Sequence, residues 1–267
     1  IPGIWLSRLM FLFLLIATLF NPIKKNLLSS IPYFLILFIG IFTIFITGER
    51  MAFMLSLCGL ILVLFALFVE KKSIRLHLIS FIFVLILSII IFAFNNPEIT
   101  NRTVISTIDQ FSKIENMFTL SDAENVMPEI GALAYTYGLV FQSAIKVWLE
   151  SPIIGVGLHT YRQVCTDFGL LGSGPGVCFH PHNISLELLS ETGVIGFTLF
   201  YAMIASIFIS IFKSYKKNGS FFVLSILTTL LFVCFFPLTT GMSIFNNGFA
   251  AIVWLIVGWL VIYQKKN

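Results

Sequence analysis

The sequence predicts an all-α protein that crosses a membrane several times. Of the 267 residues, 58% are hydrophobic and only 10% are charged, and the mean hydropathy is +1.01. A soluble domain carries about 25% charged residues, so the composition excludes that class. The net charge of +4 is spread along the chain, and we expect a lipid bilayer and no nucleic acid among the partners.

The apolar residues form about seven runs, each close to the ~20 residues that a helix needs to cross the hydrocarbon core. Helix is the expected structure because lipid cannot satisfy unpaired backbone groups. The last two runs are short, so we expect their ends to extend into polar flanks or the bilayer to thin. The runs cover residues 4–20, 27–46, 51–69, 74–94, 193–212, 221–236 and 249–263.

Charge alternates between the two ends of these spans. Every second connection is basic, which assigns it to the cytoplasm by the positive-inside rule. All acidic residues except Glu70 lie in the other connections. This topology puts Ile1 outside, and we expect residues 1–267 to be a single membrane domain that lacks the N-terminal helices of a longer protein. The basic connections hold Lys24, Lys25, Lys71, Lys72, Arg75, Lys213, Lys216, Lys217, Lys265 and Lys266.

One outer connection, residues 95–181, is far longer than the others and joins the fourth and fifth spans. Residues 139–149 within it have the periodicity of an amphipathic helix, which should end before Pro152 because the residue preceding a proline disfavours helix. We expect this helix to lie on the membrane surface or under the loop. A second short helix is expected over residues 104–117.

Cys165 and Cys178 both belong to this loop. The outer side of a cell membrane is usually an oxidising compartment, so we expect a disulfide, worth about 3 kcal/mol in the entropic treatment of loop closure; the alternative is two unrelated thiols. Cys58 and Cys234 fall in apolar runs, where cysteine is a small packing residue. No metal-ligand spacing is evident, and we expect neither a metal nor a cofactor.

Two motifs precede the fifth span. Thr47-Gly48-Glu49-Arg50 lies at the outer end of the second and third spans. The planar guanidinium of Arg50 is suited to binding the phosphate oxygens of a lipid diphosphate. Taken alone, Arg50 is more simply interpreted as an arginine that snorkels to the membrane surface. Glu49 is expected to pair with Arg50. The second motif, Pro152-x-x-Gly155-x-Gly157, follows the amphipathic helix and predicts a tight turn across the site.

The third motif is His182-Asn183, followed after nine residues by Gly193-x-x-Gly196 at the start of the fifth span. Imidazole is the usual acceptor of a proton near neutral pH, whereas a lone interfacial histidine is more often a polar anchor. Asn183 is expected to orient the imidazole or to cap the helix. Gly193 and Gly196 are expected to allow close helix packing.

These motifs, in this order, resemble the O-antigen ligase/polymerase family of membrane glycosyltransferases. The resemblance implies a GT-C-like helical bundle that transfers a glycan from undecaprenyl diphosphate without a metal, at the periplasmic face of the bacterial inner membrane. His182 would be the catalytic base and Arg50 would bind the diphosphate, with inversion at the sugar carbon. His180 and Asn183 would contact substrate.

The family has a further arginine near the start of the amphipathic helix, and this sequence has none around Tyr137-Gly138. Arg162 is the first choice to replace it in space, followed by Arg102 or Lys146.

Ligation of the glycan to lipid A-core is the activity that we favour. The first alternative is an O-antigen or exopolysaccharide polymerase of the same family, whose acceptor is another lipid-linked glycan. A second alternative, a transporter of lipid-linked sugars, usually has charged groups near the membrane midplane, whereas Arg8 and His77 lie near the ends of their runs. The spacing of the third motif argues against a non-catalytic scaffold.

Overall fold

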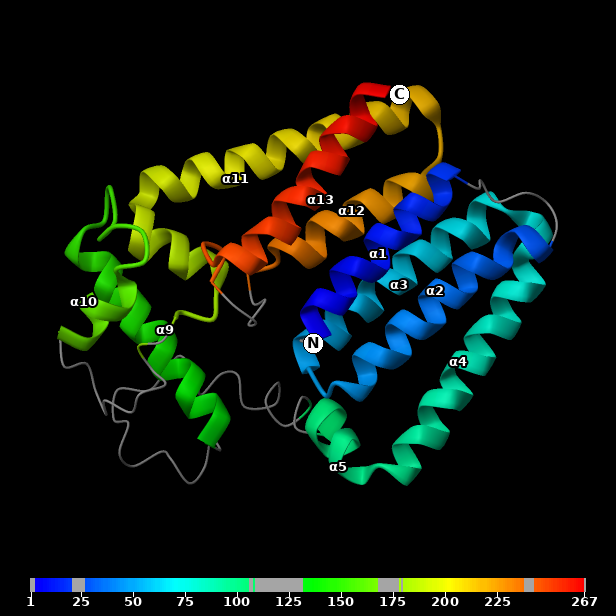
Figure 1. Ribbon diagram of the computed structural model, residues 1–267, viewed down its shortest axis with the longest axis horizontal. Coiled ribbons are helices and arrows are strands. Elements are labelled where there is room, and N and C mark those ends of the chain that lie inside the picture. The colour runs from blue at the N-terminus through cyan, green and yellow to red at the C-terminus, as the bar shows by residue number, and fades with distance from the viewer. Residues whose placement is uncertain are drawn as a thin grey trace. The chain divides into compact units, whose positions relative to one another are not determined.

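The computed structural model describes residues 3–20, 27–105, 108, 132–167, 178, 180–237 and 243–266, and all regular structure in these ranges is helical (Figure 1). Each predicted span falls on a helix. Three stretches, Arg50–Glu70, Lys72–Asn95 and Ile184–Lys217, are long and apolar enough to cross a membrane, and shorter apolar helices accompany them. The protein is therefore an all-α polytopic membrane protein. Its helices are α1 (Gly3–Phe20), α2 (Leu27–Ile46), α3 (Arg50–Glu70), η1 (Lys72–Ile74), α4 (Arg75–Asn95), α5 (Pro97–Thr100), η2 (Asn101–Ile105), α9 (Ala132–Glu150), α10 (Tyr161–Asp167), α11 (Ile184–Asn218), α12 (Phe221–Phe235) and α13 (Asn247–Lys266).

The chain forms two compact units. The first unit comprises Ile1–Ile105, Ser206–Phe236 and Val253–Asn267, and the second comprises Ser106–Ala205 and Pro237–Ile252. Helices α11 and α13 each begin in the second unit and end in the first. The motif at Arg50 thus belongs to the first unit, and the two later motifs belong to the second.

Helices α1, α2, α3 and α12 pack together in the first unit. Gly59 of α3 faces Thr229 of α12 and Phe11 of α1 so closely that a Cβ at this position would overlap both side chains. Gly40 of α2 meets Met10 of α1 in the same way. Between helices in lipid, attraction comes mainly from close van der Waals packing, which small residues permit; glycine therefore marks these two crossings.

Two glutamates join the helix ends of the first unit. The Glu49 carboxylate accepts a hydrogen bond of 3.0 Å from the amide of Ile4 at the start of α1, so Glu49 caps α1, a contact that the sequence did not predict. At the other end, Glu70 accepts from the amide of Phe222 at 2.8 Å, at the start of α12. Each of these two contacts joins two helix ends that the charge alternation assigns to the same side.

Arg8 is enclosed within the first unit, although the sequence suggested only a position near the end of a span. Its side chain is 1% exposed. It donates from Nε to the carbonyl of Val233 at 3.3 Å and from a terminal nitrogen to the carbonyl of Cys234 at 3.4 Å. Carbonyls in the last turn of a helix lack helical partners, and those of α12 receive a guanidinium instead.

In the second unit, the amphipathic helix is buried on its apolar side. Ala144 and Val147 of α9 are fully buried against Tyr161 and Cys165 of α10, and Leu186 of α11 packs on the same cluster. The helix begins at Ala132, earlier than the periodicity predicted, and ends at Glu150. Most of the second predicted helix, over residues 104–117, lies outside the described residues.

Candidate active site

The His-Asn motif forms the turn that starts α11. The Asn183 side-chain oxygen accepts from the amides of Ser185 at 2.9 Å and Leu186 at 3.2 Å, so Asn183 is the N-cap of this helix. His182 has a left-handed backbone with φ of 50°. Its amide donates to Nδ1 of His180 at 3.1 Å, and the two imidazole rings lie 3.8 Å apart between centroids. The turn therefore holds two adjacent imidazoles, tilted by 48° to each other, at the head of α11.

His180 is neutral in this arrangement. Its Nδ1 accepts a hydrogen bond, which requires an unprotonated nitrogen. The side chain is buried, and burial, with a smaller contribution from the nearby His182, lowers the pKa of His180 from 6.5 to about 4. A neutral His180 can hold the His182 backbone without placing a positive charge beside the His182 imidazole.

This pKa predicts a loss of stability in acid. The unfolded chain protonates His180 near pH 6.5 and the folded chain only near pH 4, so in this window the unfolded state binds more protons and stability falls as pH falls. Between pH 7.5 and pH 5 we expect a loss on the order of 2 kcal/mol from this residue, at 1.36 kcal/mol per pKa unit. Thermal unfolding in detergent should show the loss in wild type and much less of it in His180→Asn, whose amide oxygen can accept the same hydrogen bond without titrating. Equal pH dependence in both proteins would contradict this account of His180.

Helix α11 is broken at Gly193, where φ is 64° and ψ is −170°, and Figure 1 shows its two segments meeting at a sharp bend. In an unbroken helix the amides of residues 194 and 195 would bond to the carbonyls of residues 190 and 191. Here Val194 and Ile195 donate instead to the carbonyls of Pro152 and Ile153, at 2.9 and 3.2 Å. The break at Gly193 coincides with the residue at which the sequence begins the fifth span.

The loop after α9 supplies the complementary hydrogen bonds. Val156 donates to the carbonyl of Ser190 at 2.9 Å, and Gly157 donates to that of Glu191 at 3.0 Å. The loop thus supplies partners for the two amides and the two carbonyls of α11 whose helical hydrogen bonds the break removes. The motif that begins at Pro152 and the motif that begins at Gly193 are therefore joined by hydrogen bonds. Gly193 breaks the helix and is not the helix-packing residue that the sequence suggested.

Replacing Gly193 with alanine should damage this structure severely. The positive φ strains any L-residue, and the new Cβ would overlap the backbone of Ile153. Strain at positive φ and overpacking each cost about 1–3 kcal/mol, so we expect a loss of about 2–6 kcal/mol and a lower Tm in detergent. Gly258→Ala is the matched control, because nothing lies within 4 Å of a Cβ at that helical position. Indistinguishable melting of the two variants would contradict the assigned role of Gly193.

Glu187 and Glu191 are two functional candidates that sequence reasoning missed, because both were assigned only to the acidic outer side. Their side chains are 4% and 5% exposed. Glu187 accepts from the amide of Ile244 at 3.2 Å, and Glu191 accepts from that of His159 at 2.9 Å. Their four-residue spacing puts both on one face of α11, and that shared face was the signal available in the sequence.

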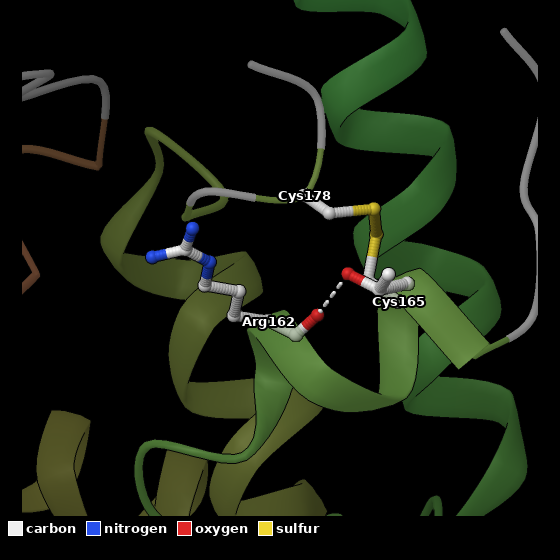
Figure 2. The surroundings of a disulfide bond; sticks show 4 residues. Arg162, Cys165 and Cys178 are labelled. Carbon is white, nitrogen blue, oxygen red and sulfur yellow. Dashed lines mark hydrogen bonds between the residues drawn. A yellow bond between two sulfur atoms is a disulfide. The ribbon is translucent and has the colours of Figure 1, made fainter. Parts of the chain in front are cut away.

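Cys165 and Cys178 form a disulfide with a Cα–Cα distance of 5.5 Å (Figure 2). It ties α10 to the segment that leads into the His180 turn, and Cys165 is fully buried beside Tyr161. Burial raises the pKa of Tyr161. Arg162 lies one turn before Cys165 in α10, and its exposed guanidinium points away from the disulfide in Figure 2.

Arg50 is the first residue of α3, directly after the Thr47-Gly48-Glu49 turn, and is partly buried. The side chain of Arg102, from η2, lies against that turn: a Cβ on Gly48 would be 3.3 Å from its Cδ and 3.6 Å from its Nε. Arg102 is therefore the candidate second arginine that the fold places near Arg50. Asn101–Ile105 can approach so closely because Gly48 has no side chain.

The other candidates belong to the second unit together with His182. Arg162 is exposed on α10 and Lys146 is exposed on α9. Within the described residues, no group of three His, Cys, Asp or Glu side chains is arranged to hold a metal ion. The structure thus gathers Arg50 and Arg102 in one unit, and His180, His182, Asn183 and the buried glutamates in the other.

Comparison with known proteins gives the family of this chain. A family model described as O-antigen ligase matches residues 35–201, more than half of the chain. The match includes the turn before Arg50, the loop after α9, the His182 turn and the break at Gly193. No curated protein matches. With its polytopic helical fold, the chain belongs to the O-antigen ligase family, whose members are membrane glycosyltransferases of the ligase or polymerase type.

Proposed function

We propose that this protein transfers a glycan from undecaprenyl diphosphate to a hydroxyl of lipid A-core, at the periplasmic face of the bacterial inner membrane. The acceptor hydroxyl gives its proton to the His182 imidazole. Its oxygen then forms a bond to the anomeric carbon, while the bond from that carbon to the diphosphate oxygen breaks. Undecaprenyl diphosphate leaves with the electron pair, and attack from the opposite side inverts the anomeric centre.

Arg50 binds the diphosphate in this mechanism. A planar guanidinium donates two parallel hydrogen bonds to phosphate oxygens and keeps its charge. The leaving group gains negative charge in the transition state, so a fixed cation lowers the barrier. Arg102, which lies against the turn before Arg50, is the proposed second cation. Guanidinium groups, and not a metal ion, then carry the charge compensation, and the mechanism needs no cofactor.

The observation that carries this proposal is the geometry of the His182 turn. A non-glycine residue in the left-handed region is strained, and such strain is characteristic of functional sites. Here the strained residue is a histidine whose amide is held by a buried, neutral His180. The turn is further fixed by the Asn183 cap and by the amide of Ile184, which donates to the carbonyl of Pro237 at 2.9 Å. An imidazole fixed in this way suits a catalytic base.

The test is transfer by the purified protein in detergent or vesicles, with lipid-linked glycan as donor and EDTA present. We expect glycan on lipid A-core when that acceptor is supplied. Transfer to a second lipid-linked glycan instead would identify a polymerase. Movement of the lipid-linked glycan across a vesicle membrane without any new glycosidic bond would identify a transporter and overturn the proposal.

A deletion strain separates the two transferase activities independently. Loss of a ligase should leave long glycan chains on undecaprenyl diphosphate and none on the core. Loss of a polymerase should leave single repeats attached to the core. We expect the first pattern, read by gel analysis of lipopolysaccharide together with extraction of the lipid-linked pool.

A further inference from the structure

His159 shares an unusual backbone conformation with His182. They are the two non-glycine residues with positive φ among the described parts of the chain, at 62° and 50°. The loop that carries His159 has glycine at its other positive-φ positions, Gly155 and Gly157. Glycine would be the unstrained choice at position 159 as well. A histidine in this strained conformation therefore indicates a use for the imidazole.

Buried side chains hold both histidines by their backbone amides. The amide of His159 donates to the Glu191 carboxylate at 2.9 Å. The amide of His182 donates in the same way to Nδ1 of His180. Because the carboxylate is bound through the backbone of His159, the imidazole itself is left exposed on the surface.

Phe245 lies against His159, with ring centroids 6.2 Å apart and planes at 70°. Phe245 follows Ile244, whose amide donates to Glu187 at 3.2 Å. Glu187 and Glu191 are one turn apart on α11, so the two carboxylates hold the two ring-bearing segments next to each other. All of these residues belong to the second unit, together with the His182 turn.

We propose that His159 and Phe245 form a sugar-binding subsite that Glu187 and Glu191 position. Imidazole nitrogens donate to and accept from hydroxyls, and an aromatic ring covers the apolar C–H face of a sugar. Glu191 lies just over two helical turns beyond Asn183, about 12 Å at 1.5 Å per residue. We assign to the subsite a sugar ring other than the one that carries the reacting carbon, and this assignment rests on the proposed function for the presence of a glycan.

His159→Gly tests the subsite with little disturbance of the fold, because glycine adopts the same φ without strain and keeps the amide that Glu191 binds. Leu158→Ala, at the exposed neighbouring residue, is the control. Affinity of the detergent-solubilised protein would be measured for three probes. They are the lipid-linked glycan extracted from source membranes, the oligosaccharide released from lipid A-core, and undecaprenyl diphosphate without sugar.

We expect His159→Gly to bind at least one of the two sugar-bearing probes about tenfold more weakly, equivalent to about 1.4 kcal/mol. The probe that loses affinity identifies donor or acceptor as the source of the sugar. Binding of bare undecaprenyl diphosphate should change less than about twofold, as should all three affinities in Leu158→Ala. Unchanged binding of both sugars, or equal weakening of the bare lipid, would overturn the subsite. Because binding needs no transfer, failure of the proposed function would appear separately, as absent product from wild type.

Glu191 variants test the positioning role. Glu191→Gln keeps an oxygen that can accept from the His159 amide, whereas Glu191→Leu does not. We expect Gln to retain sugar binding and Leu to lose it about as far as His159→Gly. If Gln loses binding as fully as Leu while both melt like wild type, positioning by hydrogen-bond acceptance is wrong.

Discussion

His182→Ala is expected to lower kcat for glycan transfer by about 10²–10⁴-fold, the usual contribution of a positioned general base. The acceptor hydroxyl would then have to lose its proton without a base held at the head of α11. His182→Gly should lose as much activity, yet it should fold at least as well as wild type because glycine relieves the strain at φ of 50°. The measurement is single-turnover transfer from lipid-linked glycan, with melting temperature recorded for each variant.

The two variants separate catalysis from folding. If the imidazole is needed only for structure, His182→Gly will be less stable as well as less active. If His182 has no catalytic role, His182→Gly will transfer glycan at close to the wild-type rate. Neither outcome is compatible with a proton-accepting His182.

Arg50→Ala should lower kcat/KM by about 10²–10³-fold, similar to removing one donor that stabilises a developing oxyanion. Arg50→Lys keeps the charge but loses the paired donors of the guanidinium, so we expect an intermediate value. Both should also weaken binding of undecaprenyl diphosphate without sugar, which a direct affinity measurement can detect.

Arg75→Ala is the matched control for Arg50. Arg75 donates to the carbonyl of Phe68 at 2.8 Å and lies 4.6 Å from the centre of that ring, at the connection between α3 and α4. Its loss should leave transfer unchanged. Wild-type affinity of Arg50→Ala for the diphosphate, or an equal defect in Arg75→Ala, would remove Arg50 from the proposed mechanism.

The order of the spans could be predicted from the sequence because lipid leaves the chain few alternatives. A run of about 20 apolar residues must form a helix when nothing else can satisfy its backbone. The basic connections then predicted which helix ends share a side, and the contacts of Glu49 with Ile4 and of Glu70 with Phe222 each join two ends assigned to one side. The pairing of Cys165 with Cys178 was predicted from the compartment, and the structure contains this disulfide.

Other features could not be read from local patterns. Glu191 was one acidic residue among many, and its burial depends on the amide of His159, 32 positions earlier. The sequence predicted only that Arg8 lies near the end of a span. Its hydrogen-bond acceptors, the carbonyls of Val233 and Cys234, come from a distant part of the chain. His159 belonged to no motif, and its strained backbone appears only in three dimensions.

The sequence by itself determined the membrane-spanning architecture, the motifs at Arg50 and His182, and the family that these motifs resemble. Tertiary structure alone decided that the loop after α9 completes the broken helix α11, pairing Val156 and Gly157 with Ser190 and Glu191. The physical reason is that hydropathy and charge are properties of each segment, whereas the partner of a buried polar group is set by whichever distant segment packs beside it.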